Sequence, residues 1–252
     1  MKIGFPNNPR KNILEEIKWI GENGFDFVDL FLEEDKAVPE KINVPAVRKM
    51  LDKYKLGAVG HTAWYFPIGS PAKGLRKAAV EEAKRYFNVL HRLNVKLVTI
   101  HANWAPGMFK AEESIAFQTE TLKSLVKEAK KYKLTVIYEP IDTSKDTLEN
   151  VSKILNNVPG LYLLLDFGHA NLFDRTPEEF IRKFHKKLKH VHMHDNNGRE
   201  DQHLPLGMGN MNLDNVIKLL KRYYDGTITL EIFSRDKDYV LLSRDKLKKL
   251  LK

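Results

Sequence analysis

Residues 97–140 read LVTIHANWAPGMFKAEESIAFQTETLKSLVKEAKKYKLTVIYEP. Two short runs rich in β-branched and apolar residues, Leu97 to His101 and Thr135 to Glu139, flank a longer amphipathic stretch from Glu112 to Tyr132. Short apolar runs of this length are typical of buried strands, and the longer periodic stretch is typical of a helix packed on them. This segment therefore predicts one strand–helix–strand unit.

The same alternation extends along the whole chain. Six further strands are predicted at Lys2 to Phe5, Phe27 to Phe31, Gly57 to His61, Tyr162 to Asp166, His190 to His194 and Thr227 to Glu231. The other helices are predicted near Asn12 to Asn23, Val44 to Tyr54, Ala72 to Leu93, Lys145 to Asn157, Pro177 to Lys187, Leu213 to Tyr223 and Tyr239 to Leu250. Eight strand–helix units without a linker predict an α/β protein with a single (β/α)₈ TIM barrel domain over residues 1–252.

An open, doubly wound parallel sheet is the alternative fold. It is disfavoured because the first predicted strand–helix turn, around Pro6 to Pro9, has no glycine-rich phosphate-binding pattern.

Composition narrows the function classes. The 252 residues contain no cysteine, which leaves histidine and carboxylate side chains as metal donors. The net charge of +9 would suit an anionic substrate or partner, although many lysines lie in helical stretches where they solvate an outer face. No apolar run approaches the roughly 20 residues that span a bilayer. We expect a cytoplasmic protein, and the Lys- and Glu-rich composition hints at a thermophile.

Possible metal ligands stand at the ends of six consecutive predicted strands. In a TIM barrel these ends share one mouth, where the functional site lies. Counting two short segments just beyond strands six and seven, nine donors are expected to converge there: His61, His101, Glu139, Asp166, His169, His192, Asp201, His203 and Glu231. So many buried imidazoles and carboxylates would repel one another or stay unsatisfied without a cation. His91, His185 and His190 fit structural roles, and His194 fits either a structural or a functional role.

An ordered series of motifs carries a family resemblance. The motifs are His61-Thr-Ala-Trp-Tyr, Thr99-Ile-His101, Tyr138-Glu139-Pro, Leu165-Asp166-Phe-Gly-His169, His190-Val-His192-Met-His-Asp195, Asp201-Gln-His203-Leu-Pro-Leu-Gly-Met-Gly209 and Leu230-Glu231. From His61 to Glu231 the chain resembles the xylose isomerase-like TIM barrels. That superfamily joins sugar and sugar-phosphate isomerases and epimerases to the DNA-repair enzyme endonuclease IV.

The resemblance implies a ligand set. The positions of Glu139, Asp166, His192 and Glu231 match the four ligands of the single divalent ion in the epimerase branch. In endonuclease IV the same positions serve two zinc ions, those of His61 and His101 complete the first, and those of His169, Asp201 and His203 hold a third. One to three divalent ions, Zn²⁺, Mn²⁺ or Mg²⁺, are therefore expected.

Two enzyme classes follow from this resemblance. The first is a metal-dependent sugar or sugar-phosphate isomerase or epimerase that acts through a metal-stabilised enediolate, with Glu139 and Glu231 as acid and base. Its substrate contacts are predicted at Trp64, Asn103, His169, Asn196 and Arg199. The alternative is an endonuclease IV-like phosphodiesterase that cleaves abasic DNA. The short loops after the strands favour the first class over the second. A third class is a sugar- or metal-binding barrel without catalysis.

Overall fold

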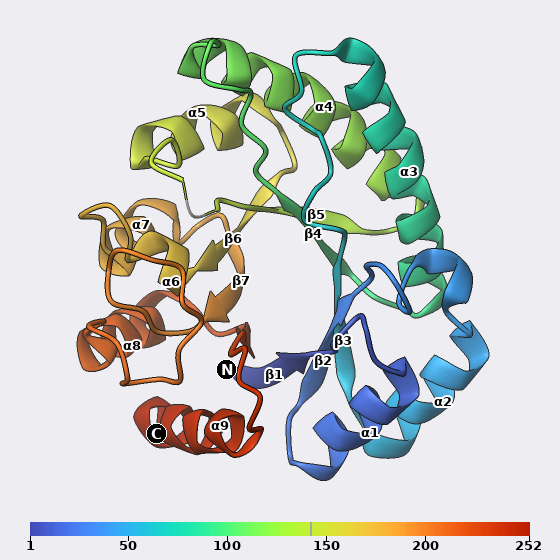
Figure 1. The fold of residues 1–252 in the computed structure, drawn as a ribbon, viewed down its shortest axis with the longest axis vertical. Helices are drawn as coiled ribbons and strands as arrows, with labels where there is room; N and C mark the ends of the chain where they lie inside the picture. The colour runs from blue at the N-terminus through green and yellow to red at the C-terminus, as the bar shows by residue number, and fades with distance from the viewer. Residues whose placement is uncertain (142) are drawn as a thin grey trace.

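Eight parallel strands close into one barrel. The computed structural model describes residues 1–141 and 143–252, and its strands pair in chain order from β1 to β8, with β8 pairing back to β1. Figure 1 looks into the barrel, with its helices in a ring around the strands. The strands are β1 (Lys2–Pro6), β2 (Phe27–Phe31), β3 (Gly57–His61), β4 (Leu97–His101), β5 (Thr135–Glu139), β6 (Tyr162–Asp166), β7 (Leu188–Met193) and β8 (Thr227–Leu230). The predicted TIM barrel is confirmed.

Helices follow the strands and cover the outside of the barrel. They are α1 (Ile13–Glu22), η1 (Pro39–Lys41, a 3₁₀ turn), α2 (Val44–Tyr54), α3 (Lys73–Arg92), α4 (Ala111–Lys131), α5 (Leu148–Asn157), α6 (Phe167–Ala170), α7 (Pro177–Phe184), α8 (Leu213–Tyr223) and α9 (Asp238–Leu251). The C-terminal helix α9, red in Figure 1, lies beside α8 and completes the ring near the N-terminus.

Local sequence sets the helix starts. Thr176 precedes Pro177 and forms a capping box with Glu179, so two backbone N–H groups at the start of α7 are satisfied by side chains. Asn12 caps α1 in a similar way by accepting hydrogen bonds from the N–H groups of Leu14 and Glu15.

The core has two parts. Most buried apolar residues lie between the strands and the helices. A second, small cluster of Phe27, Val59, Ile137 and Leu164 fills the barrel interior. Side chains two apart on a strand share a face, so Asp29, two residues after Phe27, points into the barrel above that cluster. Asp29 therefore lies beneath the candidate site described below.

Several predicted boundaries were wrong. Strand β7 runs from Leu188 to Met193 instead of His190 to His194, and β8 ends one residue before Glu231. The helix predicted from Lys145 begins at Leu148, because Thr147 caps it by accepting from the N–H of Asn150.

Two further differences concern short helical segments. Helix α7 ends at Phe184 instead of Lys187, and the single-turn α6 and η1 were not predicted. Turns of this length carry too few residues to show a helical period.

In the part of the chain that the structure describes, no helix combines the length and apolar character needed to cross a membrane.

Candidate metal centre

Four side chains at the carboxyl ends of β5 to β8 converge, and we call them the primary cluster. They are Glu139, Asp166, His192 and Glu231. The Nδ1 atom of His192 lies 2.9 Å from Glu231 Oε2, 3.2 Å from Glu139 Oε1 and 3.9 Å from Asp166 Oδ2. One ligand atom from each residue lies within 4.8 Å of one from every other. The parallel register produces this convergence, since it sets Asp166 directly opposite His192.

The atoms that face one another in the primary cluster lack hydrogen bonds. Among the described residues, both oxygens of Glu139, Oδ2 of Asp166, Oε2 of Glu231 and Nδ1 of His192 are buried without a hydrogen-bond partner. An unsatisfied buried polar group costs about 1–3 kcal/mol, and charged groups cost more. A divalent cation would satisfy one donor atom of each residue and offset the three carboxylates. Carboxylate oxygens with one imidazole nitrogen suit Zn²⁺, Mn²⁺ or Mg²⁺.

Two histidines extend the primary cluster toward β3 and β4. Glu139 Oε2 lies 3.1 Å from His101 Nε2 and 3.6 Å from His61 Nε2. The ring of His61 stacks on Phe31, with centroids 4.0 Å apart. Glu139 therefore faces His192 with one oxygen and this histidine pair with the other, which is the arrangement of a bridging carboxylate.

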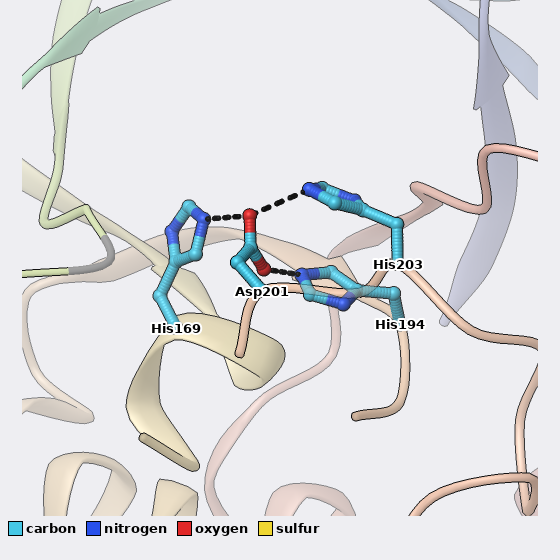
Figure 2. Close-up of side chains that lie close together, drawn as sticks. All are labelled: His169, His194, Asp201 and His203. Atoms are coloured by element: carbon cyan, nitrogen blue, oxygen red, sulfur yellow. Dashed lines mark hydrogen bonds and ion pairs between the residues drawn. The ribbon is translucent and has the colours of Figure 1, made fainter. Parts of the chain in front are cut away.

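A second group of donors, the distal cluster, comprises His169, His194, Asp201 and His203. Figure 2 shows the Asp201 carboxylate between three imidazole rings. Its Oδ2 lies 2.9 Å from His203 Nε2 and 3.5 Å from His169 Nε2, while its Oδ1 lies 3.4 Å from His194 Nε2. Within the described residues, both His194 Nε2 and Asp201 Oδ1 are buried without a hydrogen bond. These four donors also fit a divalent cation.

The one-turn helix α6 joins the two clusters. Asp166 caps it, with Oδ1 accepting a hydrogen bond of 2.9 Å from the N–H of His169, while Oδ2 faces the primary cluster. The same Oδ1 lies 3.1 Å from His194 Nε2. Gly168 leaves room for that ring, since a Cβ there would lie 1.9 Å from His194 Cε1. One carboxylate thus contacts both groups of donors.

Charges within the two clusters offset one another. Burial alone would raise the pKa of Glu139, but His101 and His192 bring it well below its usual range. Burial lowers the pKa of His192, yet Glu139 and Glu231 raise it well above its usual range. In the distal cluster, burial lowers the pKa of His203, but Asp201, Glu231 and Asp166 together raise it to about 9. A cation that binds here would therefore displace protons from histidines.

A cavity of about 830 Å³ opens beside these groups. That volume is within the roughly 300–1,000 Å³ of small-molecule sites. Six of the nine predicted donors line it: His61, His101, His169, Asp201, His203 and Glu231. The other three, Glu139, Asp166 and His192, are at most 1% exposed. Among the two glutamates of the primary cluster, Glu231 is therefore the one that faces the cavity.

The predicted substrate contacts fall into two groups. Trp64 and His169 line the cavity. Asn103, Asn196 and Arg199 are not among its lining residues.

The two asparagines are engaged elsewhere. The amide oxygen of Asn103 accepts a hydrogen bond from Gly69 N. Asn196 is fully buried and uses its amide in hydrogen bonds with Gly168, Asn171 and Gly198. Both asparagine side chains therefore form hydrogen bonds that hold loop segments together.

The cavity also has basic residues that were not predicted. Lys11, Arg235 and Lys237 line it. Lys237 lies 3.3 Å from Glu16 and stacks over the ring of Trp19. Arg199, predicted for this role, is exposed on the loop after β7.

Sequence reasoning missed two acidic residues near the primary cluster. Glu33 lines the cavity, with Oε1 4.0 Å from His61 Nδ1, and burial raises its pKa. Asp29 is fully buried below the primary cluster and accepts a hydrogen bond from His192. An aspartate inside the apolar run Phe27–Phe31 was the available signal for Asp29. For Glu33, the available signal was its position two residues past the end of the same strand.

A closed (β/α)₈ barrel with clustered histidines and carboxylates at the strand ends defines a TIM barrel whose functional end could hold a divalent cation. The chain belongs to the xylose isomerase-like TIM barrel family, whose model matches residues 17–251.

Individual proteins resemble the chain along most of its length. It is 28% identical over 236 residues to an uncharacterized protein of Methanocaldococcus jannaschii, MJ1311, covering 88% of this chain and 79% of that protein. It is 23% identical to 3-dehydro-D-guloside 4-epimerase of Escherichia coli K12, covering 98% of both. The crystal structure of a D-tagatose 3-epimerase-like protein superposes with a TM-score of 0.90 at 27% identity, over 100% of this chain and 97% of the other.

Proposed function

We propose that the protein is a divalent-metal-dependent isomerase or epimerase of a sugar or sugar phosphate. The observation that carries this proposal is the primary cluster: three carboxylates and one imidazole beside a cavity of small-molecule size, with buried donor atoms that lack a hydrogen-bond partner among the residues the structure describes. The names of two similar proteins, a 4-epimerase of a dehydro-guloside and a 3-epimerase-like protein, support the same reaction class.

The primary cluster would hold the cation through Glu139, Asp166, His192 and Glu231. Such a cation would act as a Lewis acid that lowers the cost of negative charge on substrate oxygens when a neighbouring carbon loses its proton. The protein's own residues would move that proton. Glu231 faces the cavity and directly follows β8, while Glu139 is the last residue of β5. One glutamate would remove the proton from one face of the carbon and the other would return a proton to the opposite face.

The cavity supplies the surroundings for this step. Trp64 and His169 offer an apolar wall and a polar contact for a sugar ring, and Lys11 and Arg235 offer positive charge. The barrel interior excludes water from beneath the primary cluster, since the layer of Phe27, Val59, Ile137 and Leu164 closes it. Interactions among charges are stronger in such a site than in water.

Solvent exchange tests the proposal directly. The protein, loaded in turn with Mn²⁺, Zn²⁺ and Mg²⁺, is incubated in D₂O with a panel of ketoses and ketose phosphates. Deuterium at the carbon next to the carbonyl, read by NMR, is the expected result. The chelated protein is the control. If no sugar of the panel exchanges while the protein cleaves abasic DNA, the epimerase assignment is wrong.

The distal cluster supports a second candidate function. Together the two clusters and the pair His61 and His101 supply every donor that the resemblance assigns to a trinuclear phosphodiesterase site. Cleavage of a duplex with one abasic site, measured at matched metal loading, tests this candidate. The short loops after the strands favour the epimerase.

A further inference from the structure

A fully buried carboxylate lies directly below the primary cluster. Asp29, in β2, places its Oδ2 3.0 Å from His192 Nε2, 2.8 Å from Thr229 Oγ1 and 3.3 Å from His190 Nε2. All four residues have no exposed surface. Three donors thus point at one oxygen of a single carboxylate.

Backbone pairing between strands does not by itself bring His192 and Asp29 together. In the closed barrel, β2 is separated from β7 by β1 and β8, so the hydrogen bond from His192 to Asp29 crosses the interior. A carboxylate buried among apolar residues costs free energy unless it is paired and hydrogen-bonded. An aspartate at this position is therefore explained better by what it does for its partners than by packing.

The carboxylate determines which nitrogen of His192 carries a proton. A carboxylate oxygen is an acceptor, so the Nε2 atom of His192 that points at it must be protonated. In a neutral imidazole the other nitrogen, Nδ1, then carries the lone pair. Nδ1 is the atom that faces Glu139, Asp166 and Glu231, and it has no hydrogen bond within the described residues.

We propose that Asp29 is a positioning residue that holds His192 as its Nε2–H tautomer and aims the Nδ1 lone pair into the primary cluster. Outer carboxylates of this kind fix the ring and raise the basicity of a metal-binding histidine. The inference rests on the metal site of the proposed function and is independent of the sugar reaction.

The remaining neighbours hold Asp29 in place. Thr229 donates its hydroxyl to Oδ2, and His190 lies 2.7 Å from Thr227 Oγ1 through Nδ1. With Thr227 donating to Nδ1, the Nε2–H of His190 points at Asp29 and Thr229. Asp29 is therefore oriented from two sides.

A graded set of variants tests the role. Asp29→Leu removes both the charge and the acceptor, Asp29→Asn keeps an acceptor oxygen, and the matched control Thr229→Val removes a different donor to the same oxygen. Affinity for Co²⁺ is measured by chelator competition, together with the Co²⁺ absorption spectrum and thermal unfolding. We expect about 10- to 100-fold weaker binding with Asp29→Leu, a smaller loss with Asp29→Asn and a loss under about 3-fold with Thr229→Val.

The tautomer itself is read on the unaltered protein, so the test does not depend on a variant that folds. Long-range ¹⁵N–¹H NMR of the Zn²⁺-loaded chain should show His192 protonated at Nε2. Protonation at Nδ1, or a folded Asp29→Leu variant that binds Co²⁺ like the wild type, would overturn the proposal. Failure of sugar exchange with an intact metal site would instead overturn only the sugar reaction.

Discussion

The primary and distal clusters lie at the same end of the barrel but are built differently. The primary cluster stands on strand ends whose register is fixed by backbone pairing, such as Asp166 opposite His192 and His192 opposite Thr229. In the distal cluster, Asp201 and His203 come from the loop after β7, and His203 adopts a positive φ of 47°. The barrel therefore positions the primary cluster directly, whereas the distal cluster needs a loop with its own supports.

Asp195 supplies much of that support. It is fully buried, and its carboxylate accepts hydrogen bonds from the backbone N–H groups of Asn196, Gly207 and Met211. Its backbone also pairs with Leu204, one residue beyond His203. The loop that carries Asp201 and His203 is therefore anchored near the end of β7 by both the side chain and the backbone of Asp195.

In each cluster, one histidine donates a hydrogen bond from the ring nitrogen that points away from the cluster. The acceptor differs between the two clusters. His192 donates to the Asp29 carboxylate, and His203 donates from Nδ1 to the backbone carbonyl of Glu231 at 2.8 Å. A carboxylate raises the basicity of its partner more than a neutral carbonyl does. We therefore expect the primary cluster to bind a divalent cation more tightly than the distal cluster.

The largest expected effect concerns the primary cluster. Glu231→Gln and Glu139→Gln should each lower solvent exchange into the substrate by about 10²–10⁴-fold, because each would remove one of the two proposed proton-transfer groups. Deuterium incorporation followed by NMR measures this loss. Exchange at the wild-type rate in either variant would exclude that glutamate from proton transfer.

The double variant Asp201→Ala/His203→Ala separates the two clusters. If the distal cluster only orients the substrate, this variant should keep its primary-cluster metal and raise KM by about 10-fold with little change in kcat. Metal stoichiometry by elemental analysis and steady-state kinetics are the measurements. Loss of one metal equivalent together with loss of abasic-DNA cleavage would instead establish the phosphodiesterase.

Asp195→Ala should destabilise the loop after β7 without affecting the primary cluster. Three backbone N–H groups lose their acceptor, so the free energy of unfolding should fall by about 1–3 kcal/mol. Chemical denaturation measures this change. Metal affinity of the primary cluster should stay at the wild-type value, and a parallel loss there would show that the two clusters are not separable.

The smallest expected effect is a pH dependence of cation binding. The pKa of His203 is raised to about 9, so its imidazole is protonated at neutral pH and must lose a proton before it can bind a cation. Cation affinity of the distal cluster should therefore rise from pH 7 to about pH 9 and then level off. Titration in the His203→Ala background should flatten this rise only in part, because Asp166, Asp201 and Glu139 outweigh burial and raise the pKa of His169 as well.

Sequence patterns predicted the barrel and placed candidate donors at its strand ends for one reason: each of those residues sits at a fixed place relative to an apolar strand. His61, His101 and Glu139 end their strands, and the barrel brings such ends together. His194 stood two residues beyond His192, and the period of a strand places both on one face. The two-residue period of the strand was therefore the available signal that His194 could belong to the distal cluster.

Contacts between distant strands and within loops could not be predicted. The hydrogen bond from His192 to Asp29 joins residues 163 positions apart across the barrel interior. The internal hydrogen bonds of Asn196 depend on the path of a loop, for which the sequence carries no period. Propensity and periodicity describe neighbours along a chain, and neither describes such contacts.

Gly168 gives the molecule a position with almost no mutational tolerance. The His194 ring fills the space where a side chain would stand, and it stacks on His203 at 3.9 Å, so it has little freedom to move away. Gly74 is its opposite, because no atom of the described part of the chain lies within 4 Å of a Cβ added there. In a saturation library selected for function, position 74 should accept many different residues, whereas position 168 should keep glycine. That contrast would locate the boundary of the functional site without any knowledge of the substrate.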